Sequence, residues 1–338
     1  MWAELIAFFC GLAVLVALLH AWSFRRFSIR GCHVLITGAS KGIGLELAKE
    51  SVRRQARRVT LVARNEPTLK QAAQECNNVA KEAADGGGRG SAAVEVVCKV
   101  LDVTDEEAVM AYGASLAETD PADVLINNAG GTVTKPFDDL TAADFSHCWR
   151  LNVMGGVHMC RAILPSMKQR RKGQVVFVSS QAGQVGLYGY SAYSTSKFAL
   201  RGLSEALEME AGASGVHVAI AFPPDTDTPG FREESQTRPK ITEILAAASG
   251  VFPPAVVAST IMNGVEAGLH RIPVGFDGHL LNWLTVGAGP VSSLWVTVQE
   301  FLTASVLRLV IAVYHMHWSR VVATHAHGPP TGPHTHTD

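Results

Sequence analysis

Tyr193 and Lys197 are spaced i, i+4 in a segment whose pattern predicts a helix, so their side chains lie on one face, a turn apart. A phenol has an ordinary pKa of about 10, and a neighbouring ammonium stabilises the phenolate and lowers that value. Ser180 ends a predicted strand, where its hydroxyl can hydrogen-bond a substrate oxygen, and Ser179 is the weaker candidate. These residue types predict acid–base chemistry at a substrate oxygen.

A glycine-rich segment follows the first predicted strand and precedes a helical pattern. It reads Thr37-Gly38-Ala39-Ser40-Lys41-Gly42-Ile43-Gly44. Glycines permit a tight turn and close approach to a pyrophosphate, and the helix N-terminus offers free N–H groups to the anion. An ordinary strand-to-helix turn is the alternative, and the position in a βαβ unit favours the dinucleotide site. The residues expected to contact the cofactor here are Gly38, Ser40, Lys41, Gly42, Ile43 and Gly44.

The end of the second predicted strand discriminates between NAD and NADP. Arg64 stands there, with no acidic residue before Glu66, and Lys41 adds a second cation from the glycine turn. Two cations match a 2′-phosphate and favour NADPH, although a solvated surface charge is the alternative for Arg64. Asp102 and Val103, after the third predicted strand, are expected to border the adenine, and Asp102 is equally placed to cap the next helix.

These motifs lie within a repeated strand–helix pattern. Strands are predicted at 33–37, 58–63, 94–101, 123–127, 174–179, 216–222 and 272–276, and helices at 43–55, 67–84, 105–118, 142–171 and 192–212. Several strands are continuous apolar strings, as expected for parallel strands that are covered on both faces. The pattern predicts an α/β fold with a doubly wound parallel sheet, Rossmann-like, in a single domain over residues 31–276.

The motifs occur in the order and spacing of one known family, the short-chain dehydrogenase/reductases, which the chain resembles over about residues 31 to 275. The shared motifs are Thr37-Gly38-x-x-x-Gly42-x-Gly44, Asn127-Asn128-Ala129-Gly130, Asn152, Ser180 and Tyr193-x-x-x-Lys197. The resemblance implies that a nicotinamide cofactor supplies a hydride, while the protein contributes orientation and electrostatics.

The resemblance also implies a role for each matching residue. Tyr193 is the proton donor in the reductive direction, and Lys197 holds the nicotinamide ribose and lowers the tyrosine pKa. Ser180 orients the carbonyl, and Asn152 holds a water in the proton relay. The residues that support the central strand and adjoin the cofactor are Asn127, Asn128, Ala129 and Gly130.

The segment after the sixth predicted strand departs from the family pattern. Pro224 stands where the family usually has glycine, whereas Thr228 fits the threonine expected near the nicotinamide carboxamide. We expect Thr226 and Thr228 to contact the cofactor, and the departure puts the backbone contact at Thr226 in question.

An apolar run precedes the reductase domain. Residues 5–24 carry no formal charge with His20 neutral, and a helix of that length spans roughly 30 Å, the thickness of a bilayer core. A cleaved signal peptide is the alternative, but no basic residue precedes the run and no small-x-small cleavage site follows it. Arg25, Arg26 and Arg30 favour a cytoplasmic position for everything downstream. Residues 1–24 are therefore predicted to be a membrane anchor.

A second apolar region, residues 280–318, is predicted to be helical and associated with the membrane. A re-entrant hairpin, helices lying in the interface and a helical substrate lid packed on the core all fit it. Residues 319–338 are polar and rich in Pro and His, which predicts a disordered tail. No Cys or carboxylate cluster accompanies its histidines, so no metal site is predicted.

The composition excludes several classes of protein. Of 338 residues, 47 % are hydrophobic and 17 % are charged, so the chain must bury a large core. Lys plus Arg (29) nearly cancels Asp plus Glu (30), which removes the basic field of a nucleic-acid binder. The six cysteines are scattered without paired spacing, which favours reduced thiols and a body that faces the cytosol.

Within the family, residues 176–210 and 223–231, together with the two apolar regions, are similar to anchored members that reduce a sphingoid ketone. That similarity implies NADPH-dependent reduction of 3-oxosphinganine to sphinganine on the cytosolic face of the endoplasmic reticulum membrane. The implied partners are a lipid ketone and the membrane, and a homodimer is possible through the helix that carries Tyr193. The alternatives are an anchored reductase of a steroid or retinoid carbonyl, and a catalytically silent membrane scaffold.

Overall fold

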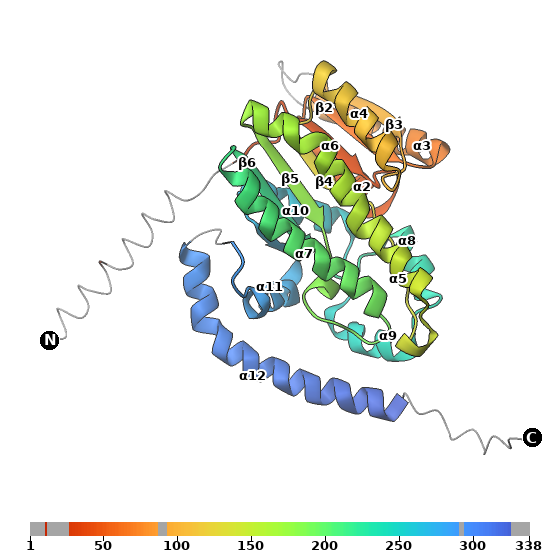
Figure 1. Cartoon of the computed structure of the whole chain (residues 1–338), viewed down its shortest axis with the longest axis vertical. Coiled ribbons are helices and arrows are strands. Elements are labelled where there is room, and N and C mark those ends of the chain that lie inside the picture. The colour runs from red at the N-terminus through yellow and green to blue at the C-terminus, as the bar shows by residue number, and fades with distance from the viewer. Residues whose placement is uncertain (1–10, 12–26, 87–92, 291–293, 326–338) are drawn as a thin grey trace, which may run out of the picture.

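The computed structural model describes residues 27–86, 93–290 and 294–325, together with Gly11. A seven-stranded parallel sheet with the order β3-β2-β1-β4-β5-β6-β7 lies at the centre (Figure 1). The strands are β1 (His33–Thr37), β2 (Arg58–Ala63), β3 (Glu95–Val100), β4 (Val124–Asn127), β5 (Gly173–Val178), β6 (Val216–Phe222) and β7 (Arg271–Pro273). Each predicted strand overlaps an observed one, and the predicted doubly wound parallel sheet is confirmed.

Helices cover both faces of the sheet. One face packs against α2 (Gly42–Arg53), α3 (Glu66–Gly86) and α10 (Pro254–Glu266), and the other against α4 (Glu106–Thr119), α6 (Gly155–Arg170) and α7 (Ser191–Gly212). Successive residues of β1 point into different cores, since Val34 and Ile36 pack in the first and Leu35 in the second. Burial on both faces is the reason that the central residues of strands such as β1 are apolar in succession.

The strand order reverses between β1 and β4, and this is where the sequence motifs meet. In open α/β sheets, ligands bind in the crevice outside the carboxyl ends of the strands at such a switch point. The glycine-rich turn follows β1, Asn128 follows β4, and Ser179 and Ser180 follow β5. Parallel strands bring all three strand ends to the same edge of the sheet.

The segment predicted as one helix over 142–171 is interrupted in the middle. Helix α5 (Ala142–Cys148) begins with a capping box between Thr141 and Asp144, and it runs into a π-helical turn, Trp149–Met154, before α6. Inserted π turns are found frequently at functional sites. Here the turn carries the predicted site residue Asn152, which is 3 % exposed.

Four further helices follow β6: α8 (Pro229–Ser235), α9 (Lys240–Ala246), α11 (Gly275–Thr285) and α12 (Leu294–His325). Helix α12 contacts α9 and α11, and Val321 near its end packs with Ile241 and Leu245. The prediction of a disordered tail from residue 319 is wrong up to His325, because this packing continues the helix. The remainder of the predicted tail and the predicted anchor, apart from Gly11, lie outside the described residues.

Helix α12 contains the stretch Val296–His325, the one segment of the described chain that is long and apolar enough to cross a membrane, with mean hydropathy 1.6. It lies along the body of the protein (Figure 1). Its outward side chains include Phe301 (81 % exposed), Leu302 and Leu309 (72 % exposed). Exposed apolar surfaces of this kind are typical of membrane-binding or protein-binding sites.

Candidate active site

A cavity of about 760 Å³ lies against the predicted site residues, a volume typical of small-molecule and cofactor sites. Ser180, Tyr193 and Lys197 line it, and Lys41 and Arg64 line the same cavity. Further walls are apolar and come from α11 and α12; they include Leu280, Leu281, Leu284, Leu307, Ile311 and Trp318. The cavity therefore joins polar groups at the strand ends to an apolar region under the C-terminal helices.

The phenol of Tyr193 is held at the start of α7, next to the end of β5. It is hydrogen-bonded to the side chain of Ser180, whose Oγ also accepts from Ala182 N at 3.1 Å. Ser179 has a different task, because its Oγ donates to Lys197 O at 3.0 Å and ties β5 to α7. The structure thus brings Ser180 to the phenol, and Ser179 supports the backbone behind it.

Lys197 lies one helical turn beyond Tyr193 and is 5 % exposed. Its Nζ donates to Val178 O at 3.0 Å and is 5.6 Å from the centre of the Tyr193 ring. Burial lowers the pKa of Lys197 to about 8. A Cβ on Gly130 would lie 3.0 Å from Asn152 Oδ1 and 3.4 Å from this Nζ, so Gly130 lies closely against both predicted site residues.

The pKa of Tyr193 is raised in this structure, whereas the sequence led us to expect a lowered value. Burial raises the pKa of the phenol, the charge of Glu234 raises it further, and the hydrogen bond with Ser180 only partly opposes them. A phenol with a raised pKa keeps its proton near neutrality. It is therefore ready to donate that proton to a substrate oxygen.

Asn152 braces the loop after β4. Its Oδ1 accepts from Gly131 N at 2.8 Å, and its Nδ2 donates to Gly131 O and to Ser196 Oγ, each at 2.9 Å. Both amide hydrogens are used within the protein. The side chain thus positions the loop against α7.

The glycine-rich turn fits a pyrophosphate. Gly38 and Gly42 have φ values of +66° and +61°, which favour glycine, and no side chain caps the N-terminus of α2. A Cβ on Gly44 would lie 2.3 Å from Gly38 O, so the helix could not pack this closely with a larger residue. Asn128 fastens the turn, because its Nδ2 donates to Thr37 O at 3.0 Å and to Gly38 O at 3.2 Å. Together the turn and the free N–H groups form an anion cradle.

The neighbouring groups also fit a dinucleotide. Ala129 N donates to Thr37 Oγ1 at 3.0 Å, which places the segment after β4 beside the turn. Ile43 lines the cavity, whereas Ser40 faces an adjoining hollow that Lys41 and Gly42 also line. The structure thus groups the residues predicted around the turn.

The two cations predicted to contact a 2′-phosphate are both accessible. Arg64 is 66 % exposed and lies 3.7 Å from Asp102 Oδ2, and Lys41 is 54 % exposed and lies 3.4 Å from Glu233 Oε1. These exposed pairs are weak, so both cations can turn toward an anion. Asp102 also accepts from Thr104 N at 2.9 Å, which makes the turn that precedes α4, and the adjacent Val103 is buried.

The segment after β6 contacts the glycine-rich turn through Thr228. A Cβ on Gly42 would be 3.0 Å from Thr228 Cγ2, so Thr228 lies directly against the turn, and its Oγ1 caps α8 by accepting from Phe231 N. Thr226 is 4 % exposed, and its Oγ1 donates to Pro224 O at 2.8 Å. Pro224 departs from the family pattern, but the loop that contains Pro224 and Thr226 still lines the cavity.

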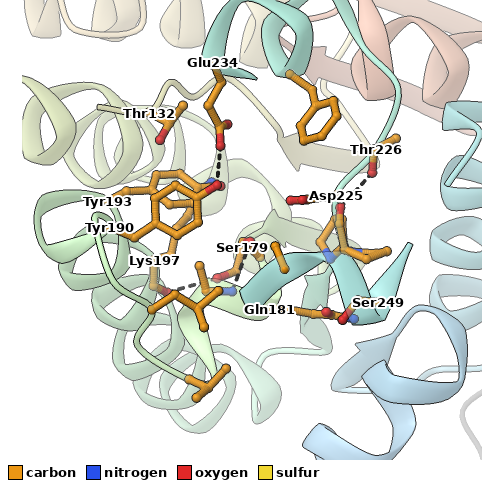
Figure 2. A pocket seen from close by; sticks show the side chains of 18 of the residues that line it. Thr132, Ser179, Gln181, Tyr190, Tyr193, Lys197, Asp225, Thr226, Glu234 and Ser249 are labelled. Atoms are coloured by element: carbon orange, nitrogen blue, oxygen red, sulfur yellow. Dashed lines mark hydrogen bonds between the residues drawn. The ribbon is translucent and has the colours of Figure 1, made fainter. Parts of the chain in front are cut away.

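Sequence reasoning missed a group of polar residues in the cavity wall: Tyr190, Asp225 and Glu234 (Figure 2). They come from separate segments with no motif spacing, so no local pattern indicates them. The apolar residues of α11 and α12 were noticed as a region, but their contact with the cavity required the fold. The signal available for them was the excess of hydrophobic residues after residue 280.

Known proteins that are similar to this chain have the same kind of domain. Residues 32–239 match the family model for short chain dehydrogenases. The chain is 39 % identical over 314 residues to a 3-ketodihydrosphingosine reductase of Bos taurus, covering 92 % of this chain and 91 % of the relative. It is 38 % identical to a 3-dehydrosphinganine reductase of Danio rerio, covering 86 % and 85 %.

A solved structure is also similar. The short-chain dehydrogenase from Sphingobium yanoikuyae in complex with NADPH has a TM-score of 0.60 and 26 % identity, covering 71 % of this chain and 87 % of that one. The nicotinamide cofactor expected from the glycine turn agrees with this likeness. From its sheet, its site and its relatives, the chain belongs to the short-chain dehydrogenase family of oxidoreductases.

Proposed function

We propose that this protein reduces the 3-keto group of the sphingoid ketone 3-oxosphinganine to sphinganine, with NADPH as the reductant. The observation that carries the proposal is the single cavity that joins Tyr193 and Ser180 to Arg64 and to the apolar walls of α11 and α12. A lipid ketone needs a polar reacting end and an apolar tail site in one space. The names of the animal relatives support the same substrate.

Ser180, Tyr193, Lys197 and Asn152 have separate roles in the proposed reduction. The cofactor, when bound, supplies the hydride to the carbonyl carbon. Ser180 Oγ holds the carbonyl oxygen, and the Tyr193 phenol donates a proton to it, because its raised pKa keeps it protonated. Lys197 would hold the cofactor ribose, and Asn152 positions the loop after β4.

The C-terminal helices support work at a membrane surface. The outer face of α12 exposes Phe301, Leu302 and Leu309, while Ile311 and Trp318 on the same helix line the cavity. We propose that the outer face rests on the lipid, so that a ketone passes from the bilayer under α12. The proposal includes residues 1–24 as an anchor, the reductase domain on the cytosolic side of the endoplasmic reticulum membrane, and a possible homodimer.

Purified full-length protein tests the substrate. It is assayed with NADPH and 3-oxosphinganine, a steroid ketone or retinal in mixed micelles, and products are identified by mass spectrometry. We expect sphinganine as the main product. Turnover of the steroid or retinal without sphinganine would favour the alternative substrates, and cofactor binding without any turnover would favour a silent scaffold.

Replacing Arg64 with Ala is expected to weaken the binding of NADPH far more than the binding of NADH. A charge-assisted hydrogen bond contributes about 1.5–3 kcal/mol, so KM for NADPH should rise about 10- to 100-fold. Arg53→Ala is the matched control, because Arg53 is an exposed arginine that pairs with Glu50 on α2. The measurement is steady-state kinetics with both cofactors. Equal losses for NADPH and NADH would show that the 2′-phosphate is held elsewhere.

Ile311→Asp is expected to impair use of long-chain ketones. Ile311 is 9 % exposed and lines the cavity, so a carboxylate there opposes burial of an alkyl tail. At about 0.8 kcal/mol per methylene, loss of two or three methylene contacts raises KM about thirtyfold. A short-chain analogue should be reduced at an unchanged rate.

The outward Leu309 supplies the matched control. Leu309→Asp is expected to weaken binding to phospholipid vesicles and to leave turnover of a micellar substrate unchanged, because Leu309 is 72 % exposed. Kinetics at several chain lengths and vesicle flotation measure the two effects. If Ile311→Asp impairs short and long ketones alike, the tail does not lie under α12.

A further inference from the structure

One wall of the cavity carries a cluster of charged and phenolic side chains that acid–base catalysis does not require. Arg238, between α8 and α9, forms a bidentate ion pair with Asp225, with N–O distances of 2.7 and 2.9 Å. Its Nε also donates to Tyr190 Oη at 2.8 Å. Tyr190 Oη in turn donates to the carboxylate of Glu234. The cluster therefore consists of Tyr190, Asp225, Glu234 and Arg238.

This cluster has one carboxylate more than it has cations. Asp225 takes the bidentate pair, so Glu234 receives only the Tyr190 hydroxyl and an Arg238 nitrogen at 3.4 Å. The Glu234 side chain is 13 % exposed, and burial raises the pKa of its carboxyl. A buried carboxylate without a full partner is costly, and a cation from a ligand would offset that cost.

The lysines and arginine that line the cavity have partners of their own. Lys197 Nζ donates to Val178 O, and Lys41 lies beside Glu233 on the exposed side. Arg64 lies beside Asp102. Among the described residues that line the cavity, none of these lysines or arginines forms an ion pair with Glu234.

Glu234 is also close to the proposed proton donor. It lines the same cavity as Tyr193, its charge raises the pKa of that phenol, and the Tyr190 ring that it contacts lies 5.5 Å from the Tyr193 ring. Figure 2 shows the carboxylate pointing toward the two phenols. Thr132 lines this cavity too, and its buried Oγ1 has no hydrogen-bond partner among the residues that the structure describes.

We propose that Glu234 binds a primary ammonium on the carbon next to the carbonyl that Tyr193 protonates, and that it thereby selects 2-amino ketones. The inference rests on the proposed function, because it assumes a ketone held between Ser180 and Tyr193. An ammonium beside that carbonyl reaches the wall that carries the Glu234 carboxylate, whose one ion pair, with Arg238, is long at 3.4 Å. Thr132 Oγ1 can accept a second hydrogen bond from the ammonium. The headgroup is then recognised by charge, and the tail by the apolar walls.

The test compares two ketones in Glu234→Gln. One is 3-oxosphinganine and the other is the same chain with hydrogen in place of the amino group. Glutamine keeps the size and the hydrogen bond from Tyr190 but removes the charge. For the amino ketone we expect kcat/KM to fall about 10- to 100-fold, mainly through KM, as when a buried charge pair loses one partner. For the analogue without the amine, kcat/KM should stay the same or rise.

Glu243→Gln is the matched control, since Glu243 is a glutamate of α9 that pairs with Lys240, away from the cavity. Equal losses on both ketones, or no loss on the amino ketone, would overturn the role of Glu234 and leave the proposed function intact. No turnover of 3-oxosphinganine by the unmodified protein would overturn both.

A second measurement on the unmodified protein does not depend on the folding of a variant. Octadecylamine should inhibit at about tenfold lower concentration than octadecanol, because only the amine pairs with the carboxylate. Equal inhibition by the two would contradict the proposal.

Discussion

Tyr193→Phe is expected to lower kcat by about 10²- to 10⁴-fold, the range that a positioned general acid contributes. The change removes one oxygen and keeps the ring, so the packing beside Tyr190 at 5.5 Å is retained. The proton that the carbonyl oxygen needs is lost, while the glycine turn and its contacts are untouched. Steady-state turnover of the lipid ketone measures kcat, and fluorescence titration measures the Kd for NADPH, which should not change.

Tyr112→Phe is a suitable control for the loss of a phenol. Tyr112 lies on α4 with Lys99 Nζ 4.6 Å from its ring, and it does not line the cavity. This variant should retain the full kcat. If Tyr193→Phe kept the unmodified rate, another group would have to be the proton donor.

Lys197→Met is expected to lower kcat/KM by about 10²- to 10³-fold, comparable to removing one electrostatic donor from an active site. Methionine fills a similar volume, so the loss is that of the ammonium and of its hydrogen bond to Val178 O. Lys70→Met on α3 removes an exposed lysine that pairs with Glu66, and it should have no effect. Activity of Lys197→Met within a few-fold of the unmodified protein would exclude the lysine from the mechanism.

The pH dependence of kcat/KM distinguishes the role of Lys197 from that of Tyr193. Burial lowers the pKa of Lys197 to about 8, so the ammonium is present below that pH and is lost above it. Burial raises the pKa of Tyr193, so the phenol keeps its proton throughout. We therefore expect kcat/KM for reduction to fall as the pH rises through about 8 in the unmodified protein. The low residual activity of Lys197→Met should lack that fall.

The sheet could be predicted because its signals are local. Strands that are buried on both faces, such as β1 and β6, are rich in consecutive apolar residues, and their predicted bounds match the structure. The π-helical turn around Asn152 could not be predicted, since an α-helix and a π turn share the same apolar periodicity. The helical end of α12 was missed because Val321 is stabilised by contacts with α9 that lie far away in sequence.

The site was predictable where the residues form spaced motifs, and less so where burial decides their chemistry. Tyr193 and Lys197 were placed together by helical spacing alone. The direction of the tyrosine pKa was mispredicted, because spacing says nothing of how much water the phenol loses. Glu234 and Arg238 were missed since their partners Tyr190 and Asp225 belong to other segments.

The central claim is that this chain transfers hydride from NADPH to the carbonyl carbon of a sphingoid ketone. Its most direct test is mass spectrometry of the product after reduction of 3-oxosphinganine with NADPH that carries deuterium at the reactive nicotinamide carbon. The account predicts sphinganine with the deuterium on the former carbonyl carbon, and no label at that carbon when heavy water is the only source. Unlabelled product from labelled NADPH, or label taken from heavy water at that carbon, would contradict it.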